Sequence, residues 1–581
     1  MIASVWAPDA GAVACRLGAA PGSPEVAMTR GDDGWWAGPE LADGTDYAFV
    51  VDGAGPFPDP RGARLPDGVH GPSRVFDVAT HAWTDGEWRG VDALGAVTYE
   101  LHVGTFTRAG TLDSAAAALP RLASVGIQMV ELMPLAPMPG ERGWGYDGVS
   151  VYAVHEPYGG PAALQRFVDA AHRLGLGVTL DVVYNHLGPD GNYLGPFGPY
   201  FTDAYETPWG WAVNLDHDGS VEVRRYLIDN ALRWFRDFHV DALRLDAVHE
   251  LHDHSDRHFL AQLSDETAAL AADLGRVLSL VAESDLNDAT MIAPTADGGR
   301  GMTAQWDDDV HHALHAYLTG ERHGYYSDFG SVEALDKAYR KVFVHDGEYS
   351  TFRGKNWGAP VPPGVDRRRF VVCAANHDQV GNRALGDRPS ASLSPGAQAA
   401  SLAFVLLSPF TPMLFMGEEY GETRPFQFFT DHAPTLGADV TAGRLDEFGG
   451  HGWEDLYGGP IEVPDPQDRA TFLRSVIDTA EASQGVHARL AQWVAELMGA
   501  RPSTLVPGAW DRHPVGVSED APRVVTLTGP VTVRANLSNT PVRFEARDVG
   551  ATFGLVTTGD GVVTVGPDSV ALIINEPRGD A

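Results

Sequence analysis

Three carboxylates that each follow an apolar run are the residues of this chain best suited to catalysis. Asp246 stands in LRLDAVH, Glu283 in SLVAESD and Asp378 in AANHDQ. A charged side chain at the end of a buried strand is costly unless that end lines a site. Glycoside hydrolysis with retention needs such carboxyl groups, one as nucleophile and one as general acid and base.

The neighbours of two of these residues predict different protonation states for them. Arg244 and Asp246 are two positions apart on a predicted strand, so their side chains point to the same face. The guanidinium favours the ionised carboxylate that a nucleophile needs. Glu283 follows the apolar Leu280, Val281 and Ala282, and burial there would raise its pKa, as a proton donor requires.

Taken singly, each motif has a structural interpretation. An Arg-x-Asp pair is more often an ion pair, a glutamate after an apolar strand is often a helix cap, and Asn-His-Asp can form a turn. In DVVYNH, Asp181 and Asn185 could be hydrogen-bonding groups at a strand end, which is the better interpretation for Asp181. Together, in this order and on successive strands, the motifs favour a catalytic site.

A metal site is the main alternative use of the histidines. His249, His252, His254 and His258 are close in sequence, but His249-Glu-Leu-His252 is one residue short of the H-E-x-x-H motif. No cysteine lies nearby to complete a zinc site. We therefore predict neither a metal nor a cofactor.

The elements that must position the carboxylates alternate between apolar strands and amphipathic helices. A (β/α)8 barrel, which places its chemistry at the carboxyl ends of its strands, is the predicted fold. A doubly wound open sheet is the rival, but no G-x-G-x-x-G motif follows the first strand. The predicted strands cover residues 97–106, 129–135, 177–186, 240–249, 278–286, 303–309, 369–378 and 411–419.

Shorter β-like pieces separated by Gly, Pro and Asp turns flank the barrel region on both sides. We predict an N-terminal β-sandwich over residues 1–90, the catalytic barrel with insertions over 91–505, and a C-terminal β-sandwich over 506–581. The first boundary falls in the stretch from Trp83 to Gly95.

The composition excludes several partners. Acidic residues number 78 and basic residues 42, which gives a formal charge of −36 and makes nucleic acid and anionic lipid unsuitable partners. The apolar run 402–416 is too short to cross a bilayer and contains two prolines, so we predict a buried helix followed by a buried strand. With no secretory signal and only Cys15 and Cys373, we expect a cytoplasmic protein without disulfides.

Four segments resemble the signature regions of the α-amylase superfamily: DVVYNH, LRLDAVH, VAES and AANHD. The resemblance implies Asp246 as nucleophile, Glu283 as general acid and base, and Asp378 as the group that holds the ring hydroxyls of the reacting glucose. It also implies that His186, Arg244 and His377 contact or orient that sugar and that Tyr146 stacks on it. Asn185 corresponds to a calcium ligand of some amylases, but no carboxylate-rich loop supports such a site.

Within that superfamily, longer segments are similar to the maltooligosyltrehalose trehalohydrolases. They include RGWGYDGVSVYAVHEPYGGP, AQWDDDVHHALH, NHDQVGNRA and PFQFFTDH. Val310 departs from the Phe that often stands there. The resemblance implies hydrolysis of the α-1,4 bond next to the trehalose end of maltooligosyltrehalose. The products are trehalose and a maltooligosaccharide, and the reaction is linked in a pathway to a maltooligosyltrehalose synthase.

Selectivity for the trehalose end must come from groups that contact the leaving group, since the bond cleaved is that of any α-1,4-glucan. Buried polar groups left unpaired by the wrong isomer penalise it strongly. We predict that the loop 306–312 supplies them. The predicted sugar-reading residues are Trp306, Asp308 and Asp309, helped by His249, Gln379 and Asn382.

Two other functions remain open from the residues. A glucan branching enzyme shares the carboxylates but transfers the glycosyl group to a sugar hydroxyl instead of water. The residues from Gln379 to Asn382 and the PFQFFTDH segment favour the hydrolase. A non-catalytic glucan-binding protein on the same scaffold usually loses one or more of the three carboxylates, and all three are present here.

Overall fold

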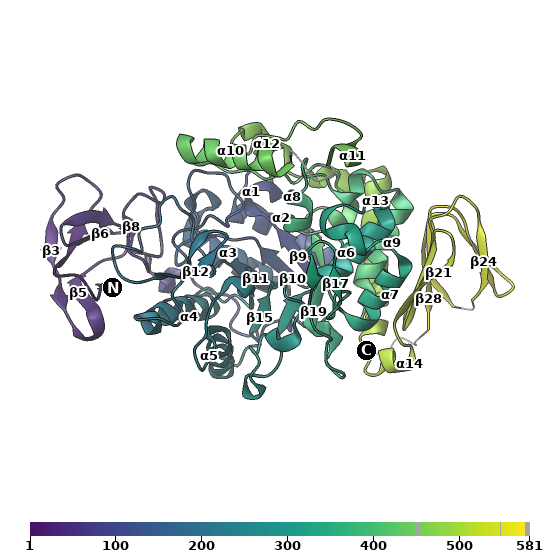
Figure 1. Ribbon diagram of the computed structural model, residues 1–581, viewed down its shortest axis with the longest axis horizontal. Helices are drawn as coiled ribbons and strands as arrows, with labels where there is room; N and C mark the ends of the chain where they lie inside the picture. Colours follow the sequence, from purple (N-terminus) through teal and green to yellow (C-terminus); the bar gives the residue numbers. More distant parts are fainter. Residues whose placement is uncertain (449–452, 547, 576–581) are drawn as a thin grey trace.

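Eight parallel strands close into a barrel at the centre of the computed structural model, which describes residues 1–448, 453–546 and 548–575 (Figure 1). Their side chains are buried, because helices cover the outside of the barrel and side chains fill its inside. The predicted fold class, a (β/α)8 barrel with flanking β-sheets, is confirmed. In order around the barrel the strands are β9 (Thr98–Leu101), β10 (Met129–Leu132), β11 (Gly177–Val182), β14 (Ala242–Leu245), β15 (Ser279–Ala282), β16 (Ala304–Trp306), β19 (Phe370–Cys373) and β20 (Thr411–Phe415).

Each predicted strand segment contains one barrel strand, but the strands end earlier than predicted. The segment 102–106, predicted as strand, folds into the short helix α1 (Val103–Phe106). Residues 308–312, predicted as a strand end and a polar loop, instead form the start of helix α6 (Asp308–Thr319). The Asp307 side chain caps this helix by accepting a hydrogen bond from the Asp309 amide. At β9 and β16, the end of the predicted strand is therefore the start of a helix.

Helices surround the barrel (Figure 1), and long segments separate strands β11 and β14 from the α-helices that follow them. The apolar run 402–416 forms the end of α9 and strand β20, as predicted, and no helix in the described ranges has the length and apolar character needed to cross a bilayer. The remaining helices are α2 (Leu112–Ser124), α3 (Gly160–Arg173), α4 (Ser220–Asp237), α5 (Phe259–Leu274), α7 (Val332–Lys341), α8 (His377–Gly381), α9 (Pro395–Leu406), α10 (Pro434–Phe448), α11 (Trp453–Tyr457), α12 (Arg469–Arg474), α13 (Gly485–Ala500) and α14 (Ala509–Arg512).

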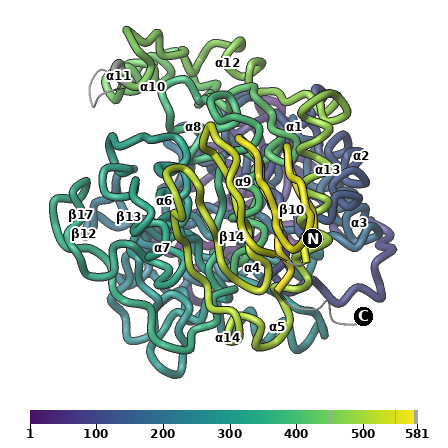
Figure 2. The backbone as a smooth tube through the Cα atoms, turned by 90° about the vertical axis from the view of Figure 1, so that its right-hand side faces the viewer, coloured from purple at the N-terminus to yellow at the C-terminus, as the bar shows by residue number. Residues whose placement is uncertain are grey.

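Antiparallel sheets lie at the two ends of the molecule, the N-terminal ones at the left of Figure 1 and the C-terminal ones at the right. Viewed from the right-hand side, the C-terminal sheets lie in front of the barrel (Figure 2). The N-terminal strands are β1 (Ile2–Trp6), β2 (Val13–Leu17), β3 (Glu25–Ala27), β4 (Thr29–Arg30), β5 (Trp35–Glu40), β6 (Asp46–Val51), β7 (Ala54–Phe57) and β8 (Ser73–Arg74). The C-terminal strands are β21 (Gly516–Ala521), β22 (Val524–Thr528), β23 (Val531–Asn536), β24 (Val542–Glu545), β25 (Val549–Phe553), β26 (Val556–Gly559), β27 (Val562–Val565) and β28 (Ser569–Ile574). Two small hairpins are formed by β12 (Phe201–Thr207) with β13 (Gly210–Val213) and by β17 (Tyr349–Ser350) with β18 (Lys355–Asn356).

A buried ion cluster fastens the segment before the barrel to the amino-terminal ends of the strands. His172 lies between two carboxylates, with Nδ1 2.8 Å from Asp85 and Nε2 2.9 Å from Asp241. Burial opposes the charge on the imidazole, but the two carboxylates outweigh it and raise the pKa of His172. Trp88 stacks on the imidazole at 4.3 Å and donates its indole N–H to Asp241. One histidine thus links the preceding segment to α3 and β14.

Replacing this histidine should destabilise the protein far more than breaking an exposed ion pair. His172→Phe keeps the stacking on Trp88 but removes the cation that Asp85 and Asp241 share, and leaves each carboxylate with one remaining ion-pair partner, His239 for Asp85 and Arg276 for Asp241. We expect the free energy of unfolding to fall by about 3–5 kcal/mol in guanidinium titrations. The control, Arg166→Ala, breaks a solvated pair with Asp113 and should cost about 0–1 kcal/mol. Equal losses in the two variants would show that the buried cluster adds nothing.

Candidate active site

Barrel register brings two of the three carboxylates together. Leu245 of β14 pairs with Ala282 of β15, so the next residues, Asp246 and Glu283, leave neighbouring strands at the same height. The Glu283 amide donates to the Leu245 carbonyl at 2.9 Å, which continues the strand pairing to the edge of the site. The sequence predicted these two residues at strand ends, and the structure places them there.

Arg244 lies beneath both carboxylates and is fully buried. Its Nη1 donates to Asp246 Oδ1 at 2.8 Å and to Asp181 Oδ2 at 2.9 Å, and its Nη2 lies 3.7 Å from Glu283 Oε2. Trp306 packs against the guanidinium, whose central carbon is 4.3 Å from the ring centroid. The predicted proximity of Arg244 to Asp246 is therefore present, and Arg244 is closer to Asp246 than to Glu283.

Asn185 holds the carboxylate of Asp246 from the opposite side. Its amide nitrogen donates to Asp246 Oδ2 and to the Asp246 carbonyl, both at 2.8 Å. The amide oxygen contacts His186, whose ring stacks on Trp209 with centroids 4.1 Å apart. The sequence analysis considered Asn185 as a strand-end group and as the counterpart of a calcium ligand, and did not predict this positioning contact. Its place in DVVYNH was the available signal.

Glu283 is held by the backbone that follows Asp246. The amide of Ala247 donates to Glu283 Oε2 at 2.6 Å, and Ala247 has a φ of 39°, in the left-handed region that non-glycine residues rarely adopt. Burial raises the pKa of Glu283, and the nearby Asp246 and Asp378 add to this effect while Arg244 opposes it. The arrangement favours a protonated Glu283 beside an Asp246 that accepts from Arg244 and Asn185.

Tyr146 and His377 complete the floor of the site. The Tyr146 hydroxyl donates to Asp181 at 2.6 Å and lies 2.8 Å from His377 Nε2, and the two rings stack with centroids 5.1 Å apart. His377 Nδ1 is 2.5 Å from Glu100. Burial opposes charging of His377, but Glu100 and Asp378 raise its pKa to about 9. Glu100 had not been identified as part of the site, since it lies mid-strand without a recognisable motif.

Asp378 is the most open of the three carboxylates, with 42% of its side chain exposed. It lies in the first turn of α8, which Asn376 caps by accepting from the Gln379 amide, rather than at a strand end as predicted. Asn382, one turn further along α8, donates to Asp378 Oδ1 at 3.2 Å. The site thus includes Asp378 and Asn382, while Gln379 is almost fully buried beside them.

Asp308 and Asp309, which follow β16, have different environments. The carboxyl group of Asp308 is near Glu283 and Asp378, and burial, followed by those charges, raises its pKa to about 8. Asp309 Oδ2 instead accepts from the Val344 amide at 2.7 Å, the His345 amide at 3.1 Å and the Asn287 side chain at 3.0 Å. Asp309 therefore holds a neighbouring loop, contrary to the prediction that it reads sugar hydroxyls.

Trp306 also differs from its predicted role. It is 5% exposed and packs inside the barrel against Arg244, because β16 ends at this residue and directs its side chain inward. His249 remains beside Glu283, with its Nδ1 accepting from the Asp285 amide at 3.4 Å. Of the predicted sugar-reading residues, the structure brings Asp308, His249, Gln379 and Asn382 to the site rim.

An open cavity of about 430 Å³ adjoins this centre and was not predicted. Asp147 and His186 line it, and so do Trp209 and Trp211, which are 48% and 65% exposed on the β12–β13 hairpin. Exposed tryptophans beside a hydroxyl-rich substrate site provide flat apolar faces for sugar rings. The TPWGWAV segment was the available signal.

Metal-binding geometry is absent from the parts of the chain described here: no three His, Cys, Asp or Glu side chains are grouped as a metal site requires. Asn185 uses its amide on Asp246 and His186. The charges at this centre are balanced by Arg244 and His377 instead.

A family model for the α-amylase catalytic domain matches residues 78–196. The crystal structure of a putative α-amylase from Salmonella typhimurium is 35% identical, covers 98% of this chain and 97% of its own, and superposes with a TM-score of 0.86. A pullulanase from Anoxybacillus, 18% identical with a TM-score of 0.68 over 98% of this chain and 86% of its own, shares the fold.

Relatives with assigned functions identify the family within this superfamily. A maltooligosyltrehalose trehalohydrolase from Arthrobacter ramosus is 53% identical over 86% of both chains, and one from Rhizobium sp. (strain M-11) is 48% identical over 96% of this chain and 94% of its own. A glucan branching enzyme from Bacillus cereus is 35% identical over only 40% of each chain. This chain therefore belongs to the maltooligosyltrehalose trehalohydrolase family of the α-amylase superfamily.

Proposed function

We propose that this protein hydrolyses the α-1,4 bond next to the trehalose end of maltooligosyltrehalose, with retention, and releases trehalose and a maltooligosaccharide. The observation that supports it best is the asymmetric position of Arg244, 2.8 Å from Asp246 and 3.7 Å from Glu283. Asp246 accepts hydrogen bonds from Arg244 and Asn185, while burial raises the pKa of Glu283. One carboxylate held by donors beside one carboxyl group with a raised pKa suits the two-step mechanism.

In the first step, an Asp246 oxygen attacks the anomeric carbon while Glu283 gives its proton to the glycosidic oxygen of the departing trehalose. In the second step, Glu283, now a carboxylate, takes a proton from water, whose oxygen attacks the same carbon. The bond to Asp246 breaks and its carboxylate is regenerated. Asn185 and Arg244 hold the Asp246 carboxylate in place through both steps.

Binding of the reacting glucose falls to the floor and rim of the site. We assign Asp378 to the ring hydroxyls, because it is the exposed carboxylate of the three. Glu100 raises the pKa of His377, so its charged ring can donate hydrogen bonds to the sugar, as can His186. Tyr146 offers the face of its ring for stacking. Trp209 and Trp211 extend this surface to other sugar units of the substrate.

Asp308 is the best candidate for reading the trehalose hydroxyls. With a pKa near 8 it is protonated at neutral pH and can donate a hydrogen bond as well as accept one. Among the described residues, none forms a hydrogen bond with the carboxyl group of Asp308. This group is therefore available to a ligand, unlike that of Asp309. Further candidate groups are His249, which lies near Glu283, Asn382, which donates to Asp378, and Gln379, which follows Asp378 in the chain.

The cellular setting follows from the substrate. Maltooligosyltrehalose must be supplied by an enzyme that forms the trehalose end, and we propose a maltooligosyltrehalose synthase as the pathway partner. A charge of −36 disfavours nucleic acid and anionic membranes as partners and suits a neutral glucan. We propose the cytoplasm as the compartment.

Loss of the nucleophile should abolish turnover without unfolding the protein. Asp246→Ala removes the group that forms the covalent intermediate, so kcat should fall by about 10⁴-fold or more. The control Asp297→Ala changes an exposed carboxylate that takes part in none of the site contacts described above and should keep full activity. Proton NMR of the wild-type reaction should show the maltooligosaccharide released first as the α anomer. Initial release of the β anomer would exclude the two-step mechanism.

Glu283 should set the basic limb of the pH profile. Its raised pKa keeps the proton that the leaving group needs until the pH rises through that pKa, after which kcat should fall. Glu283→Gln should lose nearly all activity, and the residual rate should lack this limb. Persistence of an unchanged basic limb in the Gln variant would assign the acid role to another group.

Asp308 and Asp309 form a matched pair for testing selectivity. Asp308→Ala should reduce kcat/KM for maltooligosyltrehalose by about 1–3 kcal/mol, and hydrolysis of plain maltooligosaccharides much less. Asp308→Asn should recover most of the loss, because an amide also donates. Asp309→Ala, which releases the loop at Val344 and His345, should lower both activities in equal proportion. An equal loss for Asp308→Ala would place the selectivity elsewhere.

A further inference from the structure

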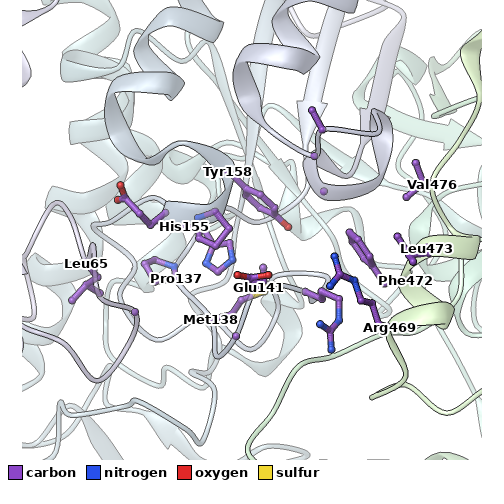
Figure 3. A pocket seen from close by; sticks show the side chains of 18 of the residues that line it. Leu65, Pro137, Met138, Glu141, His155, Tyr158, Arg469, Phe472, Leu473 and Val476 are labelled. Atoms are coloured by element: carbon purple, nitrogen blue, oxygen red, sulfur yellow. The ribbon is translucent and has the colours of Figure 1, made fainter.

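A second cavity, of about 630 Å³, lies outside the catalytic centre. Figure 3 shows Pro137, Met138, Glu141, His155 and Tyr158 on one side and Arg469, Phe472, Leu473 and Val476 on the other. Leu65, from the segment between strands β7 and β8, lies at the far edge (Figure 3). Asp246, Glu283 and Asp378 are not among its lining residues. The proposed reaction leaves this cavity without a role.

Two buried polar groups in the wall lack partners. His155 is 2% exposed, and its Nε2 has no hydrogen-bond partner among the described residues. Burial lowers the pKa of His155 to about 4, so the ring is neutral at physiological pH. The Nε of Arg142 is likewise buried without a described partner, while its Nη2 donates to Asp431 at 2.6 Å. Buried polar groups without partners are costly, and a bound ligand would satisfy them.

The charges around the cavity are largely paired already. Arg142 is neutralised by Asp431, and Glu156 pairs with Arg64 at 2.5 Å. Arg469 and Glu141, both exposed at the rim, carry opposite charges, and Arg108, which also lines the cavity, lies 3.8 Å from Asp478. The wall therefore has little net charge to attract an anion, although it contains arginines.

The remaining wall combines apolar faces with neutral hydrogen-bonding groups. Phe472, Tyr158 and Met138 supply the apolar surface, and His155 supplies a neutral donor or acceptor. Such a mixture suits sugars, which present apolar ring faces edged with hydroxyl groups. The volume lies within the usual range of small-molecule sites. We propose that this cavity binds a neutral oligosaccharide of two or three glucose units, as a second site separate from the catalytic centre.

Isothermal titration of the Glu283→Gln protein, which should retain almost no activity, tests this with maltotriose and with trehalose as probes. We expect at least one of the two sugars to bind at two sites. Leu473→Trp should place a bulky ring in the cavity and obstruct sugar binding, and because Leu473 is 54% exposed the change should not disturb folding. It should remove one site and leave the affinity of the other unchanged. Phe472→Ala should weaken the same site about tenfold.

Leu445→Trp is the matched control, since Leu445 is 51% exposed on α10 and does not line the cavity. It should retain both sites. A single site for both sugars in the parent, or two sites surviving Leu473→Trp, would overturn the proposal. Inorganic phosphate should give no heat, and phosphate binding that Leu473→Trp abolishes would make the cavity an anion site instead. The proposed hydrolysis is tested independently when Leu473→Trp is made in the protein that retains Glu283 and its products from maltooligosyltrehalose are identified.

Discussion

A fully buried guanidinium is the constraint on which the catalytic centre depends. Transferring the charge of Arg244 out of water costs several kcal/mol, which only well-placed carboxylates can offset. Asp181 and Asp246 lie within hydrogen-bonding distance of its Nη1, and Glu283 lies farther away at 3.7 Å. The same cation thus lies between the strands beneath the site and is placed unequally with respect to the two carboxyl groups above it.

A second cation, His377, extends this network across the barrel. Its ring nitrogens contact Glu100 and Tyr146, and Tyr146 donates to Asp181, which returns to Arg244. Inward-facing charged residues from strands β9, β11 and β14 are therefore linked in one hydrogen-bonded chain. Charge-assisted hydrogen bonds of this kind are strong in a low-dielectric interior and fix the floor against which a sugar would rest.

Helix starts bring the remaining groups to the rim. The caps at Asp307 and Asn376 begin α6 and α8 directly after their strands, so Asp308 and Asp378 occupy first turns that face the centre. Adjacent positions in a helix point in different directions, which separates Asp308 from Asp309. Asp309 is left to bind the amides of Val344 and His345 and supports the loop beside the site.

Apolar runs of strand length and the ionisable residues that follow them were enough to predict the barrel, the three carboxylates and the pairing of Arg244 with Asp246. These features depend on local pattern and on the rule that parallel strands share one carboxyl-terminal edge. Other features could not be predicted in this way. The contacts of Asn185 and Glu100 join residues that are far apart in sequence. The burial of Trp306 depends on strand packing, and the different environments of Asp308 and Asp309 depend on their positions around the helix. Only the tertiary structure decided them, because strand register and packing determine which polar groups meet, whereas the sequence shows only which polar groups need partners.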